Sequence, residues 1–258
     1  MRSPSAYFKA ALRKEHWKNL ARIPMVYKHP IRDGLLRYVL GWGSYPATIS
    51  VASPTGVISV RVANPVDLFT INEVFNFECY RAGHSMETFV DFGANIGVAS
   101  VYFLTRNSFS SGFAFEPLEA NYKLAAANLS AFGERITLKR LAVADREGTI
   151  ALGVEPTGRY SGLDGRGARI EQFRCIGAND ALEDALGKLG RIDVLKIDVE
   201  GSERLIIPAL APEILKRIDA IYVEAQVRDW ENLSAAGFKR TLSMTFFEGT
   251  GGIARFSR

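Results

Sequence analysis

The pattern of apolar and polar positions changes near Met86, and from there to the C-terminus it predicts a single α/β domain. Short apolar runs typical of buried strands alternate with segments of helical periodicity, as happens when helices cover both faces of a parallel sheet. The expected strands are residues 88–92, 112–115, 136–143, 192–197, 220–225, 238–247 and 252–256. The expected helices are residues 96–104, 121–132, 180–189, 203–210 and 230–236. We therefore expect a doubly wound sheet of about seven strands that ends in an antiparallel pair.

The segment before Met86 is too short and too interrupted to bury a core of its own. We expect residues 1–85 to cap a main domain formed by residues 86–258. The cap should contain an amphipathic helix, a β-hairpin and an aromatic-rich lid helix, at residues 5–20, 47–52 with 57–62, and 67–80 respectively. Pro24 and Pro30 are expected to break the helical pattern after the first of these, because proline disrupts a helix interior.

The composition is that of a globular protein, and it argues against sites built from cysteine or histidine. The chain has 258 residues, of which 47% are hydrophobic and 23% charged. Cys79 and Cys175 are far apart, and the three histidines have no close ligand spacing, so neither a disulfide framework nor a metal centre built from cysteine or histidine is predicted. An apolar run of about 20 residues, which a bilayer span needs, and a signal-peptide core are both missing from the sequence, so we expect a cytoplasmic protein.

The charge is unevenly distributed along the chain. Residues 1–40 carry nine Lys and Arg against two Asp and Glu, a net charge of +7, which leaves −3 for the rest of a chain whose total is +4. Two interpretations stay open: a solvated helical face, or peripheral contact of residues 1–40 with the inner face of a membrane or another anionic partner. We expect no nucleic-acid partner, and the sequence does not indicate an oligomeric state.

The strongest local signal is the turn VDFGANIG at residues 90–97, where a strand runs directly into a helix. Glycines at 93 and 97 allow a tight turn and the close approach of a ligand. Asn95 stands where a dinucleotide fingerprint would have glycine, and the acidic Asp91 would oppose a pyrophosphate. Asp91 suits the ammonium group of S-adenosyl-L-methionine better, and Glu116 closes the second strand where an acid can accept ribose hydroxyls.

Four motifs together carry a resemblance to a known family: VDFGANIG (90–97), FEP (115–117), AVAD-x-x-G (142–148) and, the most specific, LKIDVEGSE (195–203). In these motifs the chain resembles the FkbM-type family of S-adenosylmethionine-dependent methyltransferases, from about residue 67 to the C-terminus. The resemblance implies a Rossmann-like, seven-stranded methyltransferase fold. It implies that Asp91, Gly93, Asn95 and Gly97 hold the methionine part of the cofactor and Glu116 its ribose, with Ala144 and Asp145 near the adenine. It also implies O-methylation of a sugar, a glycan precursor or a related metabolite.

Three acids after the fourth strand, Asp198, Glu200 and Glu203, form the expected catalytic group, because they reach the same sheet edge as the glycine turn. Methyl transfer to a hydroxyl requires an aligned acceptor oxygen and removal of its proton. Asp198 can serve as that base, or Asp198 and Glu200 or Glu203 can hold a divalent cation. A structural role for Glu203 also stays open, at the start of a helix that Ser202 would cap.

Further residues are candidates for contacts around this centre. Tyr80 is expected to face the sulfonium of the cofactor through its ring. Glu224, Ser161 and His84 are candidates for acceptor contacts, although a lone histidine is more often structural. Lys196, inside the fourth strand, suits an ion pair with a neighbouring acid. The alternative function is a non-catalytic module of the same fold that docks on a membrane or a partner through its basic N-terminus.

Overall fold

The structure is a computed structural model that describes residues 14–155, 157, 162–163, 169–224, 230–245 and 252–258. Its main feature is a seven-stranded sheet in the order β11-β12-β10-β9-β3-β4-β5. The strands are β3 (Thr88–Phe92), β4 (Ser111–Phe115), β5 (Ile136–Lys139), β9 (Ile192–Ile197), β10 (Ile218–Glu224), β11 (Lys239–Thr245) and β12 (Gly252–Ser257). Strands β3, β4, β5, β9 and β10 are parallel, and β12 is antiparallel to both β10 and β11. The predicted Rossmann-like, doubly wound sheet with an antiparallel end is confirmed.

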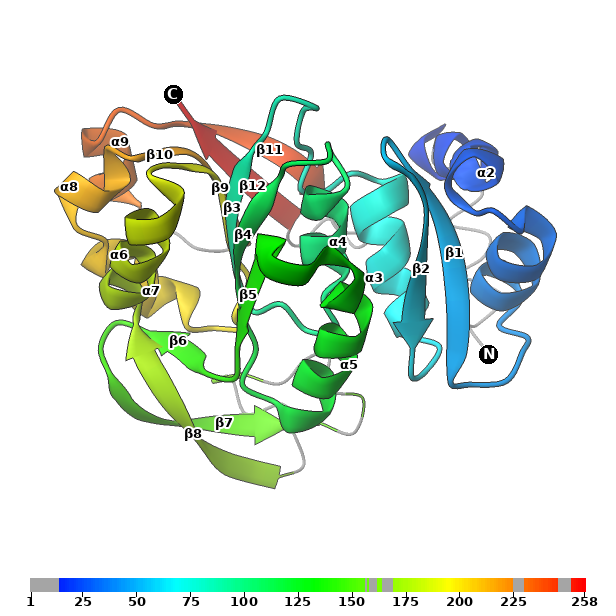
Figure 1. The fold of residues 1–258 in the computed structure, drawn as a ribbon, viewed down its shortest axis with the longest axis horizontal. Helices are drawn as coiled ribbons and strands as arrows, with labels where there is room; N and C mark the ends of the chain where they lie inside the picture. Colours follow the sequence, from blue (N-terminus) through cyan, green and yellow to red (C-terminus); the bar gives the residue numbers. More distant parts are fainter. Residues whose placement is uncertain (1–13, 156, 158–161, 164–168, 225–229, 246–251) are drawn as a thin grey trace.

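Helices cover both faces of this sheet (Figure 1). One face carries α4 (Val98–Leu104) and α5 (Glu119–Leu129), which continues into the 3-10 turn η3 (Ser130–Arg135). The other face carries α6 (Ala178–Leu189), α7 (Glu203–Ala209), α8 (Pro212–Leu215) and α9 (Glu231–Ala235). Among the described residues, no helix has both the length and the apolar composition needed to cross a membrane.

The two-residue alternation of the strands divides the core between these faces. In β3, Phe89 belongs to the cluster on the α4 and α5 side, whereas Val90 and Phe92 belong to the cluster on the α6 side. The same alternation in β9 places Val194 with the first cluster and Leu195 with the second. Asp91 pairs in register with Lys196 of β9, so these two buried charged residues lie opposite each other within the sheet.

The N-terminal cap extends the α4 and α5 side of the molecule into further layers (Figure 1). It consists of α2 (Lys14–Val26), the π-helix η1 (Pro30–Val39), the hairpin of β1 (Ala47–Ser53) and β2 (Gly56–Val62), α3 (Asp67–Ile71) and the π-helix η2 (Asn72–Asn76). The hairpin is confirmed, with Ser53 opposite Gly56 at its turn. The lid helix predicted over residues 67–80 ends earlier, at Asn76.

The expected break at Pro24 is wrong, because Pro24 lies inside α2. Only Met25 and Val26 follow it in the helix, so the backbone hydrogen bond that proline cannot donate is lost only near the end. Pro30 occupies the first turn of η1, where its missing N–H has no intrahelical partner to lose.

Asn128 of α5 joins the cap to the glycine turn. Its Oδ1 accepts a hydrogen bond from the backbone N–H of Arg61 in β2 at 2.7 Å, and its Nδ2 donates to the carbonyl oxygen of Ile96 at 2.8 Å. The side chain is buried, so both bonds form away from water and hold the hairpin and the turn at a fixed spacing.

A small third sheet was not predicted from the sequence. It contains β6 (Ala142–Ala144), β7 (Gly148–Val154) and β8 (Arg169–Gly177), with β8 in the centre. The predicted strand 136–143 is therefore two strands, because the chain leaves the main sheet after Lys139 and then pairs with β8. The exposure of β8 alternates along the strand, as expected where one face of a sheet is covered.

Candidate active site

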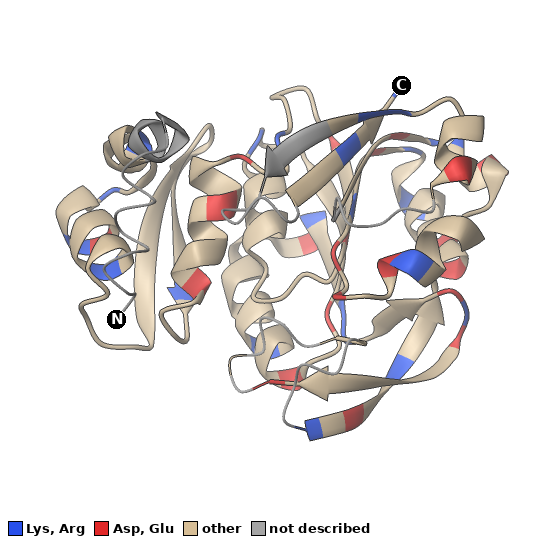
Figure 2. Ribbon diagram, turned by 180° about the vertical axis from the view of Figure 1, so that it is seen from behind, with Lys and Arg blue, Asp and Glu red and all other residues tan. Residues whose placement is uncertain are grey.

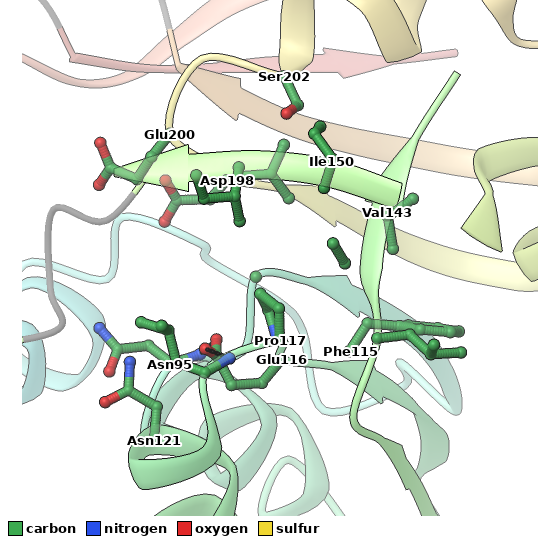
Figure 3. Close-up of a pocket in the computed structure, with 16 residues that line it drawn as sticks. Asn95, Phe115, Glu116, Pro117, Asn121, Val143, Ile150, Asp198, Glu200 and Ser202 are labelled. Atoms are coloured by element: carbon green, nitrogen blue, oxygen red, sulfur yellow. Dashed lines mark hydrogen bonds between the residues drawn. The ribbon is translucent and has the colours of Figure 1, made fainter. Parts of the chain in front are cut away.

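A pocket opens at the carboxyl ends of β3, β4 and β9 (Figure 3). The order of the sheet reverses between β3 and β9, and open α/β sheets bind ligands at such a switch point. The lining comes from the turn after β3 (Gly93, Asn95), the end of β4 and the start of α5 (Phe115, Glu116, Pro117, Leu118, Asn121), the chain around β6 (Leu141, Ala142, Val143), β7 (Ile150, Leu152) and the loop after β9 (Asp198, Val199, Glu200, Ser202).

The glycine turn forms one side of this pocket, and its backbone packs closely against the loop after β9. Gly93 has φ +79°, and a Cβ at this position would lie 1.9 Å from the carbonyl oxygen of Asp198. Any side chain here would therefore separate the turn from the loop after β9. The N–H groups of Gly93 and Ala94 both donate to the carbonyl oxygen of Phe115, at 3.1 and 2.9 Å. Asn95 has φ +52°, a conformation that asparagine tolerates better than most residues.

Glu116 connects the turn to β4. Its Oε2 accepts a hydrogen bond from the backbone N–H of Asn95 at 2.8 Å, and its Oε1 accepts one from the N–H of Leu118 at 3.0 Å. Burial raises the pKa of Glu116 to about 7, although these two bonds, the charge of Lys196 and a hydrogen bond with Asn121 act in the opposite direction. The two carboxylate oxygens together can accept about four hydrogen bonds, so the residue retains capacity for the ribose contact expected of it.

Asp91 lies beneath the turn and does not line the pocket. Its side chain is 0% exposed, and its Oδ1 forms an ion pair with Lys196 Nζ at 2.8 Å. Its Oδ2 accepts a hydrogen bond from Ser100 Oγ at 2.7 Å. Lys196 also donates to the carbonyl oxygen of Gly93 at 2.8 Å. The predicted ion pair of Lys196 is confirmed, and through it Asp91 supports the backbone of the turn from behind.

Asp198 is the acid that the structure brings to the pocket beside Lys196. Its side chain is 30% exposed, and its Oδ2 lies 3.6 Å from Lys196 Nζ. Tyr80 donates its hydroxyl hydrogen to the same Oδ2 at 2.8 Å. Burial, and then the charge of Asp198, raise the pKa of Tyr80 well above its usual range, so the phenol keeps the proton that it donates. Among the described residues, hydrogen bonds to the Asp198 carboxylate engage Oδ2 alone.

Tyr80 therefore has a different place from the one expected. It does not line the pocket, and its ring lies under Lys196 Nζ, which is 5.4 Å from the ring centroid. The sequence alone offers no signal for its bond to Asp198, because 118 residues separate the two. The residue orients an acid at the pocket and does not present its ring to a ligand there.

Glu203 and Glu200, the other two acids of the expected catalytic group, differ in position. Glu203 is buried outside the pocket lining, and its two oxygens accept hydrogen bonds from the N–H groups of Val199 and Gly201, each at 2.7 Å. It fixes the loop after β9, while Ser202, expected to cap α7, makes no side-chain capping bond. Glu200, with φ +49°, lines the pocket, and Figure 3 shows its carboxylate on the same side as that of Asp198.

The remaining candidates are scattered. Ala144 is buried in β6 and Asp145 follows it, but Leu141, Ala142 and Val143 line the pocket instead, because the chain turns into the small sheet before reaching the expected pair. His84 is exposed and precedes β3, so it lies at the opposite edge of the sheet from the pocket. Glu224 ends β10 at the pocket edge, but its side chain and all of Ser161 lie outside the described residues.

The contribution of β7 to the lining was not expected from the sequence. Ile150 and Leu152 of β7 add an apolar wall, which the alternation of residues 148–154 would have identified. For a metal ion, the described part of the chain offers no group of three or more His, Cys, Asp and Glu side chains that could hold it.

The pKa of Glu116 leads to a testable pH dependence of stability. Because its folded-state pKa of about 7 is above its ordinary value of 4.5, the protonated form favours folding, and this contribution is lost as the pH rises through 7. Relative to Glu116→Gln, the wild type should lose about 2–3 kcal/mol of unfolding free energy between pH 5 and pH 8. Urea unfolding of both proteins across this range measures the difference, and parallel pH curves would contradict the assignment.

Comparisons with known proteins address the identity of this fold and pocket. The model of the FkbM methyltransferase domain matches residues 91–243, a segment that contains the glycine turn, Glu116 and Asp198. A comparison with curated proteins gives no significant match.

Several solved structures are similar at low sequence identity. They include a precorrin-6y C5,15-methyltransferase from Geobacter metallireducens, at 15% identity and a TM-score of 0.42, covering 70% of this chain and 83% of the other. An O-methyltransferase from Bacillus cereus in complex with SAH matches at 15% identity and a TM-score of 0.42, and the match covers 68% of this chain and 76% of the other. An rRNA methylase from Streptococcus thermophilus matches at 10% identity and a TM-score of 0.43, and the match covers 73% of this chain and 95% of the other.

The family match spans more than half of the chain and includes every segment that lines the pocket. The strand order, the glycine that no side chain can replace at position 93 and the buried acid after β4 are all compatible with the cofactor of that family. The chain belongs to the FkbM family of S-adenosylmethionine-dependent methyltransferases.

Proposed function

We propose that this methyltransferase forms methyl ethers, with a hydroxyl group of a sugar, a glycan precursor or a related metabolite as the acceptor. The observation that carries the proposal is the position of Asp198, a partly exposed carboxylate at the pocket with one oxygen held by Tyr80 and Lys196. An alcohol must lose its proton as its oxygen is methylated, so a fixed carboxylate beside the cofactor pocket suits a hydroxyl acceptor.

The proposed reaction needs only one proton acceptor from the chain. When bound, S-adenosylmethionine supplies an electrophilic methyl group on its sulfonium. The acceptor oxygen forms the new C–O bond as the methyl–sulfur bond breaks, and the hydroxyl proton passes to Asp198 Oδ1. Tyr80 and Lys196 hold Oδ2, which fixes the orientation of the carboxylate and leaves the other oxygen toward the pocket. The sulfur keeps the electron pair of the broken bond, so charge and atoms balance.

Glu200 supports the choice of a polyhydroxylated acceptor. It lines the pocket on the same side as Asp198 and is partly exposed (Figure 3). A second carboxylate beside the base can accept hydrogen bonds from the hydroxyl next to the reacting one, which a sugar provides and a simple alcohol does not.

The test is a transfer assay with the purified chain, S-adenosylmethionine carrying a labelled methyl group, and panels of nucleotide sugars, glycosides and amine or carboxyl acceptors. We expect label in a sugar product that survives mild base, as an ether does and a methyl ester does not. Label found only in amines or base-labile esters would overturn the proposal. A parallel assay with a chelator separates the two roles of Asp198: unchanged turnover favours the base, and a loss that Mg²⁺ restores favours a metal ligand.

A further inference from the structure

We propose that the end of the molecule formed by α2 and η1 docks on an anionic lipid surface. This inference is independent of the proposed acceptor. It rests on a group of exposed apolar side chains, Met25, Ile31, Leu35, Leu40 and Trp42, which we call the docking face. Of the nine large apolar side chains exposed among the described residues, these five fall within eighteen consecutive positions.

The backbone of η1 arranges three of these side chains in one stripe. In a π-helix each N–H bonds to the carbonyl five residues earlier, so residues four and five apart lie nearly above one another. The bond from the N–H of Leu40 to the carbonyl of Leu35 has this spacing. Ile31, Leu35 and Leu40 follow it, and they are 70%, 47% and 47% exposed.

The opposite side of η1 is fixed to the protein, so the stripe cannot turn inward. Gly34 lies so close to α2 that a Cβ would be 2.2 Å from Ile23 Cγ2. Asp33 is 0% exposed, and its carboxylate holds Arg32 at 2.8 Å and Arg37 at 3.5 Å. This contact orients η1 and also turns its one acid away from solvent.

The segment that carries the docking face has a net positive charge. Residues 20–46, all of them described, contain four Lys and Arg and a single acid, the buried Asp33. Lys28 is exposed between Met25 and Ile31, and Arg32 is half exposed beside Ile31. Figure 2 shows blue segments on the helices of the cap. The body of the chain beyond residue 40 has the opposite net charge, −3, so an anionic surface attracts this end in preference.

Exposed leucine, isoleucine and tryptophan bordered by Lys and Arg are the features by which interfacial helices bind anionic bilayers. A purely electrostatic partner would explain the cations but not 73% exposure of Met25 and 64% exposure of Trp42. The helices of the cap lie in its outermost layer, on the far side of β1 and β2 from the main sheet (Figure 1). The pocket is lined by residues 93–202 of the main domain, so a membrane bound at the cap helices leaves it open.

The experiment is sedimentation of the full chain with vesicles of phosphatidylcholine alone and of phosphatidylcholine mixed with phosphatidylglycerol. We expect binding to the anionic vesicles only, and weaker binding as salt is added. The double substitution Ile31→Ser with Trp42→Ser should reduce the partition coefficient at least about tenfold. Lys28→Glu should reduce it about tenfold or more at low salt.

The matched control is Phe109→Ser with Ile170→Ser, which removes two similarly exposed apolar side chains elsewhere and should leave vesicle binding unchanged. Circular dichroism verifies that each variant is folded. Binding equally to neutral vesicles, no binding at all, or binding unaffected by the Ile31, Trp42 and Lys28 variants would each overturn the proposal. Light scattering provides a last arm: a dimer that the Ile31 and Trp42 variant converts to a monomer, without vesicle binding, would assign the face to self-association instead.

Discussion

Asp198→Asn is expected to bind S-adenosylmethionine about as well as the wild type while losing turnover by about 10²- to 10⁴-fold, the range typical of removing a general base. The amide has the shape of the carboxylate and still offers an oxygen to the Tyr80 hydroxyl, which lies 2.8 Å from Asp198 Oδ2 in the wild type. It has no capacity to take the acceptor's proton. Calorimetry with the cofactor and single-turnover methyl transfer measure the two quantities separately.

The matched control for Asp198→Asn is Asp184→Asn, an exposed acid on α6 whose partner is Lys139. It should alter neither binding nor turnover. Turnover retained by Asp198→Asn would exclude the residue as the base. A loss of cofactor affinity equal to the loss of turnover would instead assign Asp198 to the cofactor.

Lys196→Met should destabilise the protein by about 3–5 kcal/mol, the usual result of removing one partner from a buried ion pair. Burial alone would lower the pKa of Lys196, but Asp91 and then Asp198 raise it above its ordinary value, so the ammonium is charged in the folded state. Among the described residues, its loss leaves the fully buried Asp91 with the Ser100 hydroxyl as its hydrogen-bond donor, and it removes the donor to the Gly93 carbonyl. Urea unfolding measures the change in the free energy of unfolding.

Lys139→Met is the corresponding control, because it breaks a partly exposed pair with Asp184 and should cost about 1 kcal/mol or less. Cofactor affinity should fall at least about tenfold in Lys196→Met, since the turn loses its support from below. The double variant Asp91→Asn with Lys196→Met should recover part of the lost stability, because no unpaired charge then remains at position 91. Equal destabilisation by the Lys196 and Lys139 variants would contradict the ascribed role.

The position of Asp91 shows what a local motif predicts and what it leaves to the tertiary structure. The turn after β3, its glycines and the acid after β4 follow from local patterns, because strand, tight turn and helix are encoded by consecutive residues. The direction of the Asp91 side chain depends on which strand lies next to β3. That neighbour is β9, more than 100 residues away, and its Lys196 forms an ion pair with the Asp91 carboxylate.

The small sheet illustrates a different limit. Residues 136–143 are mostly apolar, with Lys139 and Arg140 in the middle. No feature of the neighbouring sequence indicates that Lys139 is the last residue to pair with β4. Only the presence of β8 beside Ala142–Ala144 divides the stretch and moves the pocket wall from Ala144 and Asp145 to residues 141–143. The alternation of Ile150, Leu152 and Val154 within β7 was present in the sequence and would have supported this arrangement.

The sequence by itself determined the class of the sheet, the hairpin, the glycine turn and the family motifs, because each depends on periodicity or on residues adjacent in the chain. The uneven charge of residues 1–40 was equally visible in the sequence, but the sequence did not show which side chains around these charges are buried and which are exposed. Tertiary structure alone decided that Tyr80 meets Asp198, that Glu203 turns into its own loop, that His84 lies at the far edge, and that Asp33 is buried while apolar side chains on η1 face outward. These outcomes depend on contacts between distant segments, and the free energy of such contacts is fixed by packing and burial, which no local pattern encodes.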